Sequence, residues 1–176
     1  MKKRTNIMIC VILMIALVLF DQLTKIHIVN HCTEYEIYKN YFGDVINITL
    51  VYNKGAAFSL GNDLDGILRV FVLQLLPIVG LLFLLFFALF SKDINNTQRI
   101  FIFGILAGGI GNLLDRFFRA DGVVDFIDVK FFGIFGMDRW PTFNIADTTV
   151  VIFGICLFIS IIIKEFQSKE KTKITE

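Results

Sequence analysis

Two aspartates of this chain, Asp125 and Asp147, could hydrolyse a peptide bond without a metal or a cofactor. Two carboxyl groups held close together in a low-dielectric site cannot both ionise easily, so they share a proton and their pKa values separate. The ionised group can act as general base on a water molecule. The protonated group can polarise a peptide carbonyl and then protonate the leaving nitrogen. The sequence alone shows only that both residues could reach the same layer of the protein.

Other catalytic and metal chemistries find less support in the residue pattern. No GxSxG motif is present, and neither Ser59 nor Ser91 has a His or Lys partner at a defensible spacing. Cys32 follows His31, but neighbours in sequence need not face each other. His27 and His31 are four residues apart and could bind a metal, yet no third ligand follows at a persuasive spacing. We therefore expect no metal site and no cofactor.

Long apolar segments must position these polar residues. The 176 residues are 56% hydrophobic and include 20 Phe, whereas a soluble domain is roughly 45–50% apolar. Four stretches have about the 17–25 residues needed to cross a bilayer. They are about residues 7–26, 67–90, 100–116 and 144–163. We expect one mainly α-helical membrane domain covering residues 1–176. The net charge of +1 gives no indication of nucleic-acid binding.

The first apolar stretch resembles a secretory signal peptide, because three basic residues precede it. No small-x-small cleavage site follows, and the stretch instead meets Asp21 and Lys25, so we interpret it as a retained span. Basic residues crowd the short segments before this stretch, at 91–99 and after the fourth stretch. The positive-inside tendency then predicts that both termini are cytoplasmic. The longer segments, about 27–66 and 117–143, would face outward.

The outer segments contain their own regular structure. Residues 45–53 alternate apolar and polar side chains, the period-two pattern of a half-buried strand, and residues 122–130 form a weaker strand candidate. Residues 61–66 read as a turn before the second span. We predict a small β-sheet lying on the outer membrane surface.

Polar residues from three spans are expected to meet at one depth. With a rise of about 1.5 Å per residue, Asp21 lies about 21 Å from the cytoplasmic end of its span and Asn112 about 18 Å. Arg116 and Asp147 each lie about 24 Å up, in a hydrocarbon core about 30 Å thick. Ionisable groups within spans are costly in lipid and are functional candidates by default. The sequence thus predicts a polar layer near the outer face.

Residue spacing also places these groups on helix-packing faces. Gly104 and Gly108 form a GxxxG pair that favours close helix contact, and the same face continues to Asn112. Three further pairs lie three or four residues apart and can share a face. They are Asp21 with Lys25, Asn112 with Arg116, and Asn144 with Asp147.

Two other interpretations of the polar layer remain open. The charges could be interhelical ion pairs of a purely structural membrane subunit. They could instead form the proton relay of a transporter or channel, since intramembrane carboxylates also serve that role. A relay requires polar residues through the whole bilayer, and the inner halves of these spans are almost free of charge.

Five segments, in order along nearly the whole chain, resemble the motifs of type II signal peptidase, the bacterial lipoprotein signal peptidase. They are 21–25 (DQLTK), 53–58 (NKGAAF), 108–116 (GGIGNLLDR), 123–126 (VVDF) and 143–147 (FNIAD). The resemblance implies an aspartyl endopeptidase of the bacterial cytoplasmic membrane, with four spanning helices, an outer β-cradle and an active site near the outer leaflet. Its substrate would be a diacylglyceryl-modified prolipoprotein, cleaved just before the lipidated cysteine, and globomycin-type inhibitors would bind.

The resemblance also implies roles for particular residues. The catalytic pair would be Asp125 and Asp147. Seven further motif positions would bind substrate or support the site: Asp21, Lys25, Asn53, Gly55, Asn112, Arg116 and Asn144. Among these, Asn112 and Asn144 could bond the substrate backbone. Arg116 could hold a carboxylate or a lipid headgroup, or could form a structural ion pair with Asp115 or Asp21.

One segment departs from the family pattern. Residues 131–140 are longer and more aromatic than expected between the last two motifs. Trp and Phe favour the membrane interface, so this segment could dip into the outer leaflet. A simple apolar loop would explain the same residues.

Overall fold

The computed structural model describes residues 3–55 and 66–175, with side chains up to residue 167. Residues 56–58 of the second motif, and the predicted turn up to residue 65, lie outside the described residues. Four helical segments among the described residues are long and apolar enough to cross a membrane. They are α1 (Lys3–His31), the continuous run of α2 (Gly66–Val70), η2 (Phe71–Leu75) and α3 (Leu76–Phe90), then α4 (Asn96–Phe118) and α5 (Ile145–Thr175).

The four predicted spans are confirmed, but three helices extend beyond the predicted bounds. α4 begins at Asn96 rather than at residue 100, because the Asn95 and Gln98 side chains each accept the other's backbone N–H in a capping box. α5 begins at Ile145, so Asn144 precedes the helix instead of belonging to it. Local capping, which apolar content does not reveal, sets these ends.

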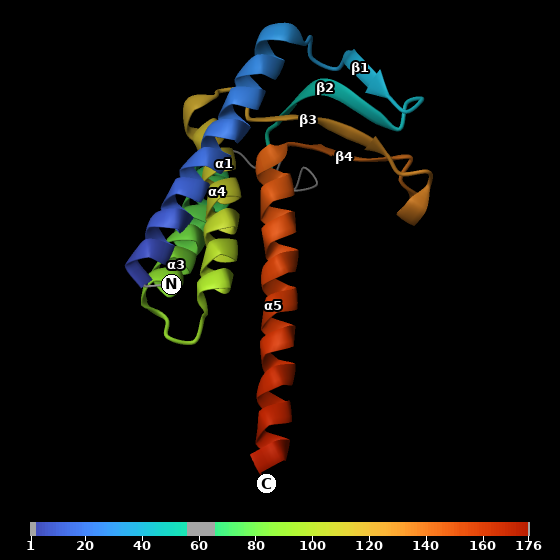
Figure 1. Ribbon diagram of the computed structural model, residues 1–176. Coiled ribbons are helices and arrows are strands. Elements are labelled where there is room, and N and C mark those ends of the chain that lie inside the picture. The colour runs from blue at the N-terminus through green and yellow to red at the C-terminus, as the bar shows by residue number, and fades with distance from the viewer. Residues whose placement is uncertain (1–2, 56–65, 176) are drawn as a thin grey trace.

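Helix α4 lies at the centre of the bundle and packs against α1, α3 and α5 (Figure 1). Its predicted glycine face is confirmed. A Cβ on Gly108 would lie 2.4 Å from the backbone oxygen of Ala146, and one on Gly104 would lie 2.2 Å from Phe153. Only glycine therefore permits α5 to approach α4 this closely.

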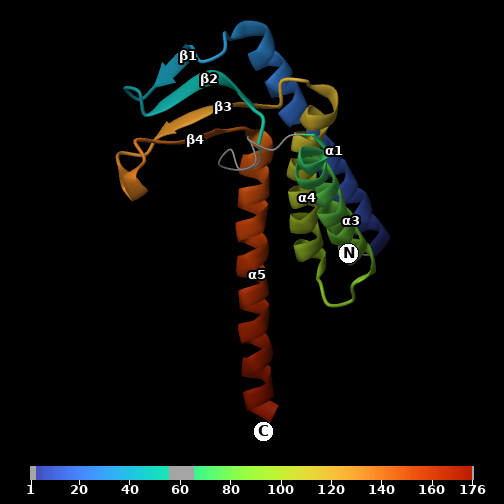
Figure 2. The ribbon, with the colours of Figure 1, turned by 180° about the vertical axis from the view of Figure 1, so that it is seen from behind.

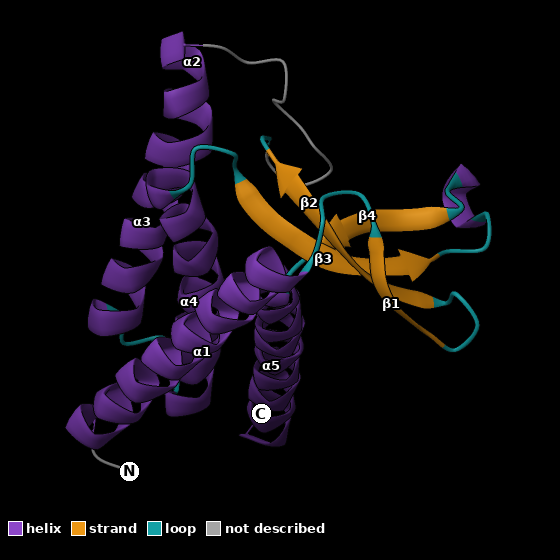
Figure 3. Ribbon diagram, turned by 90° about the horizontal axis from the view of Figure 1, so that it is seen from above, coloured by secondary structure: helices purple, strands orange, loops and turns teal. Residues whose placement is uncertain are grey.

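A four-stranded antiparallel sheet in the order β1-β2-β3-β4 covers one end of the bundle (Figures 1 and 3). Its strands are β1 (Ile37–Tyr41), β2 (Ile46–Asn53), β3 (Val123–Lys130) and β4 (Arg139–Phe143). The strands predicted at 45–53 and 122–130 match β2 and β3 within one residue, whereas β1 and β4 were not predicted. Leu50, Val124 and Phe126 pack with Ile28 of α1, so the sheet is fixed to the bundle by an apolar cluster.

The burial pattern of β2 differs from simple alternation. Asn47 and Thr49 are buried, whereas Ile46 and Ile48 are only half-buried. A register shift between Ile48 and Val51 interrupts the pairing with β3, and such a shift changes which residues face the core. The two buried polar side chains remain bonded, because Asn47 donates to Asp44 and Thr49 donates to the Glu36 carbonyl.

Candidate active site

The two aspartates approach each other where β3 passes the start of α5. Asp125 is the third residue of β3, and Asp147 lies in the first turn of α5. Both line one cavity of about 230 Å³, together with Asn53, Asn112 and Arg116. Asp125 is almost fully buried, whereas Asp147 is half-buried. The structure therefore brings together two carboxyl groups that are 22 positions apart in the chain.

Asn144 joins the two carboxyl groups directly. Its side-chain Nδ2 donates to Asp125 Oδ1 at 2.6 Å, and its backbone N–H donates to Asp147 Oδ2 at 3.2 Å. Its Oδ1 accepts from the Asp147 backbone N–H at 2.9 Å, so Asn144 also caps the N-terminus of α5. The same residue thus caps the helix and fixes the positions of the two carboxyl groups relative to each other.

Asn112 of α4 holds Asp147 from the other side. Its Nδ2 donates to Asp147 Oδ1 at 2.7 Å, while its Oδ1 accepts from Lys25 Nζ and from Asn144 Nδ2, both at 3.0 Å. An ammonium group has no acceptor, so the Asn112 atom facing Lys25 must be the oxygen. Lys25 therefore fixes the amide so that its N–H points at Asp147.

Lys25 is fully buried and is neutralised by two carboxylates. Its Nζ lies 3.0 Å from Asp21 Oδ2 and 2.8 Å from Asp115 Oδ2. A buried ammonium without such partners would cost several kcal/mol. Asp21 also accepts the Ala146 backbone N–H, and Asp115 accepts that of Val124, the neighbour of Asp125. One ionic cluster thereby joins α1 and α4 to the segments that carry Asp125 and Asp147.

Two members of this cluster were not on the predicted site list. Asp115 was considered only as a possible ion partner of Arg116, and Gln22 only as part of the motif at residues 21–25. The Gln22 side chain donates to the Gly111 carbonyl at 3.0 Å and to Asp115 Oδ1 at 3.2 Å. In the sequence, the one indication of their importance is that Gln22 follows Asp21 and Asp115 precedes Arg116. Only the packing of α1 on α4 shows which groups they bind.

Asn53 at the end of β2 supplies the second bond to Asp125. Its Nδ2 donates to Asp125 Oδ2 at 3.0 Å, and its Oδ1 accepts the Gly55 backbone N–H at 2.9 Å. Gly55 is buried. The backbone N–H of Gly55 therefore orients the Asn53 amide, in the way that Lys25 orients the Asn112 amide.

Arg116 binds backbone carbonyls rather than a carboxylate. Its guanidinium donates to the oxygens of Leu73, at 3.1 Å, and Gly55, at 2.9 Å. In an α-helix the Leu73 carbonyl would accept from residue 77, but Pro77 has no N–H to donate. The two carboxylates considered as ion partners of Arg116, Asp115 and Asp21, bind Lys25 instead. Arg116 thus joins the second span to the turn after β2.

The electrostatics of the cavity favour a proton on Asp125. Burial, followed by the nearby charge of Asp147, raises the pKa of Asp125 from 3.8 to about 7, against the opposing effect of hydrogen bonds from Asn53 and Asn144. The N-terminal end of α5 favours negative charge on Asp147. The arrangement can therefore hold one protonated and one ionised carboxyl group near neutral pH.

The two histidines that were considered as metal ligands lie apart from this cavity. The rings of His27 and His31 stack with centroids 4.3 Å apart at the end of α1. Neither His is among the residues that line the cavity of the two aspartates. Within residues 3–55 and 66–167, no group of three or more His, Cys, Asp or Glu side chains is placed to hold a metal ion.

Comparisons with known proteins converge on one family. Residues 13–163 match the family described as signal peptidase (SPase) II. The lipoprotein signal peptidase of Treponema denticola is 49% identical over 153 residues, which cover 87% of this chain and 88% of that protein. The lipoprotein signal peptidase of Borrelia turicatae is 51% identical over 143 residues, covering 81% and 82% of the two chains.

Solved structures show the same architecture. A bacterial membrane enzyme determined by the in meso method at 2.3 Å superposes with a TM-score of 0.72 at 32% identity, covering 95% of this chain and 92% of that one. A second bacterial membrane enzyme, determined by the same method at 1.9 Å, gives a TM-score of 0.69 at 33% identity and covers 90% and 93%.

Proposed function

Since this chain belongs to the signal peptidase II family, we propose that it is an aspartyl endopeptidase that removes the signal peptide from diacylglyceryl-modified prolipoproteins. Cleavage would fall just before the lipidated cysteine. The observation that carries the proposal is the bridge through Asn144, which holds Asp125 and Asp147 in a single cavity. Like-charged carboxyl groups so placed are the arrangement that divides acid and base roles between two identical side chains.

The roles of the two aspartates follow from their surroundings. Asp147, at the helix N-terminus, takes a proton from a water molecule, and the water oxygen attacks the scissile carbonyl carbon. Asp125, protonated near neutral pH, donates a hydrogen bond to the carbonyl oxygen as negative charge develops there. Collapse of the tetrahedral intermediate breaks the C–N bond, and the departing nitrogen takes a proton from the pair. The water has then supplied OH to the carbonyl carbon and H to the amine.

The supporting residues act mainly by positioning the pair. We suggested that Asn112 and Asn144 could bond the substrate backbone, but their amide groups are used by Lys25 and the two aspartates. We assign to them the orientation of the carboxyl oxygens. Arg116 lines the cavity and donates to the Gly55 carbonyl, so it holds the chain just after Asn53 in place.

The membrane setting supports the proposal. A substrate anchored by its diacylglyceryl group holds its scissile bond near one membrane surface, and a fixed depth lowers the entropy lost in orienting it. β3 and the first turn of α5, which carry the two aspartates, lie where the sheet meets the helices (Figure 1). This end of the bundle faces the outer leaflet if both termini are cytoplasmic. We propose this orientation, in the bacterial cytoplasmic membrane. Membrane lipids and globomycin-type inhibitors are the other expected partners.

The interior of the bundle gives no support to the transport alternative. A second buried polar cluster exists at the opposite end, where Arg99 donates to Asn6 and to the Ala88 carbonyl. This cluster qualifies the expectation that the inner halves are nearly free of charge. However, an apolar core that includes Ile102, Phe103 and Leu106 separates it from the aspartate cavity. A proton path would have to cross that core.

The decisive experiment measures cleavage of a diacylglyceryl-modified precursor by purified protein in lipid. Asp125→Asn and Asp147→Asn should each abolish cleavage, whereas Asp128→Asn should retain it. Asp128 is a suitable control because it lies on the same strand as Asp125 but pairs with Arg139 at the far end. The precursor without its diacylglyceryl group should remain uncut. Cleavage by either active-site variant would refute the role of the pair.

A further inference from the structure

The connection between β3 and β4 ends in an apolar tip, residues 131–137, which carries no charged side chain. Its three largest exposed side chains are Phe132, Ile134 and Phe135, which are 66%, 51% and 87% exposed. A cluster of this kind at one end of a hairpin marks an interaction surface in a soluble or peripheral domain.

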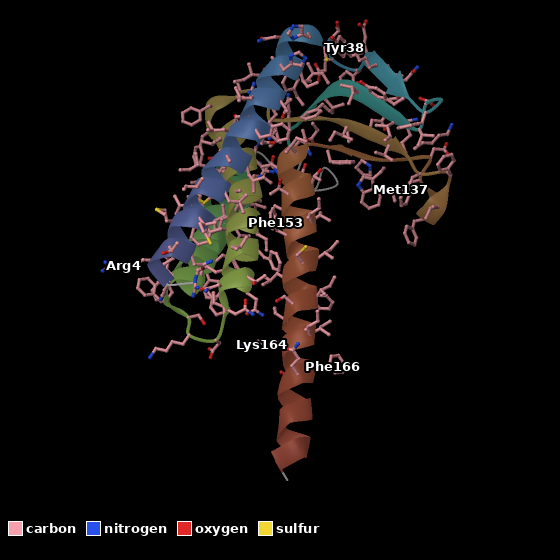
Figure 4. The ribbon with its side chains drawn as sticks, in the orientation of Figure 1. Arg4, Tyr38, Met137, Phe153, Lys164 and Phe166 are labelled. Carbon is pink, nitrogen blue, oxygen red and sulfur yellow. The ribbon has the colours of Figure 1, made fainter. Side chains whose placement is uncertain are left out.

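The tip lies on the side of the sheet from which the helices extend. In Figures 1 and 2 the end of the hairpin bends below the sheet, to the level of the first turns of α5, and remains separate from that helix. Figure 3 shows the same end of the hairpin far to the side of the bundle. Figure 4 places Met137 there. The exposed apolar face of α5 begins at Val151, within its second turn, so the tip lies close to the height at which the lipid-facing surface of the bundle starts.

The backbone of the tip holds two aromatic residues in a left-handed conformation. Phe132 and Phe135 adopt φ values of 55° and 53°, in the left-handed region that favours glycine or asparagine. A bulky residue at such a position carries backbone strain, which persists because the surrounding turn holds it there. Both rings are nevertheless largely exposed, so the turn presents two large apolar surfaces outward.

The residues around the tip match a membrane interface. Charged side chains flank it on both sides, with Lys130 before it and Asp138 and Arg139 after it. The Lys130 ammonium lies 5.9 Å from the ring centroid of Phe132, and the ring of Trp140 lies 5.0 Å from that of Phe131. The apolar end would lie among the acyl chains, the aromatic base at the interface and the charged flanks among the headgroups. This order is the one expected of a segment inserted into a membrane surface.

We propose that residues 131–137 insert into the leaflet on the sheet side of the bilayer and anchor the sheet to lipid. The insertion does not depend on any enzymatic role. A consequence that does rest on the proposed function concerns depth. The hairpin connects β3, which carries Asp125, to β4, which leads into Asp147, so an inserted tip holds both carboxyl groups at a constant distance from the lipid surface.

The chain offers a sensitive probe, because Trp140 is its only tryptophan. In a Trp140→Phe background, Phe135→Trp places a single fluorophore on the tip. Phe42→Trp is a matched control: Phe42 lies in the turn between β1 and β2, is 80% exposed and has a φ of 55°. That turn lies above the tip in Figure 1, beyond the charged residues that flank the tip, because its Asp44 pairs with Lys130 and Arg139. Both proteins are reconstituted in phosphatidylcholine vesicles, with aqueous iodide or acyl-dibrominated lipid as quencher.

The proposal expects dibrominated lipid to quench Phe135→Trp and iodide to have little effect, with the opposite result for Phe42→Trp. Equal iodide quenching of the two proteins, with no effect of brominated lipid, would overturn it. Shielding of Phe135→Trp that disappears when the protein is diluted in lipid would indicate a second copy of the chain, and would also overturn it.

A second variant separates insertion from folding. Asparagine suits left-handed backbone, so a combined Phe132→Asn and Phe135→Asn protein should fold at least as stably as the parent. Its native Trp140 should nevertheless lose quenching by brominated lipid and emit at longer wavelength. Unchanged Trp140 quenching in this folded variant would contradict the anchor.

Discussion

Replacing Asp125 by asparagine should abolish cleavage and yet make the folded protein more stable at alkaline pH. In the folded state the pKa of Asp125 is raised to about 7, by burial and by the charge of Asp147. A group whose pKa is raised in the folded state contributes its full stabilisation below the unfolded-state pKa, near 3.8. This contribution to folding stability is lost as the pH rises through about 7. At about pH 8 the ionised Asp125 therefore opposes folding.

The size of the effect follows from that pKa. Each pKa unit corresponds to about 1.4 kcal/mol, so an ionised Asp125 costs the folded state about 4 kcal/mol at pH 8. Asparagine removes the charge and therefore this cost. However, its amide cannot accept hydrogen bonds from both Asn53 and Asn144, and the lost bond lowers stability by about 1–3 kcal/mol. The expected net stabilisation at pH 8 is about 1–3 kcal/mol, or several degrees in Tm. Near pH 5 little or no stabilisation by Asp125→Asn should remain, because Asp125 is then protonated in the folded parent protein.

The same substitution at another buried aspartate should lower the stability of the folded protein instead of raising it. Asp115 is also fully buried, but it neutralises Lys25 and binds Arg119. Asp115→Asn removes a compensating charge from a buried ammonium and should cost about 3–5 kcal/mol. Thermal unfolding of both variants and the parent in lipid nanodiscs at the two pH values is the assay. If Asp125→Asn lowers Tm at pH 8 as Asp115→Asn does, the electrostatic account of the site is incorrect.

Two further predictions concern acidity and packing. The kcat/KM of the peptidase should fall as the pH rises above about 7, because protonated Asp125 is required; a constant value up to about pH 9 would contradict this assignment. Gly108→Ala should lower stability by about 1–3 kcal/mol, because its Cβ meets the Ala146 backbone oxygen. Gly154→Ala, where nothing lies within 4 Å of the added carbon, should change Tm little, and equal effects of the two substitutions would exclude close packing of α4 on α5 as the cause.

The sequence predicted the large elements well because burial in lipid leaves a strong signal. The spans needed only apolar length, and β2 and β3 were visible from alternation and β-branched residues. The edge strands β1 and β4 were missed because their residues are exposed or half-buried and show no clear period. Their existence depends on pairing with β2 and β3, which is a property of the sheet rather than of the segment.

Residue types and their depth along the helices determined from the sequence alone that Asp21, Asn112 and Asp147 would share one layer. Only the tertiary structure decided the partners within it. A helix rotation or a capping bond decides whether an amide faces a lysine or a carboxylate, and neither is encoded in spacing. Asn144 bridges the two carboxyl groups because it caps α5 directly beneath β3. Asp115 belongs to the cluster because α1 brings Lys25 against α4, and hydrogen bonding, unlike hydrophobicity, depends on the position of both partners.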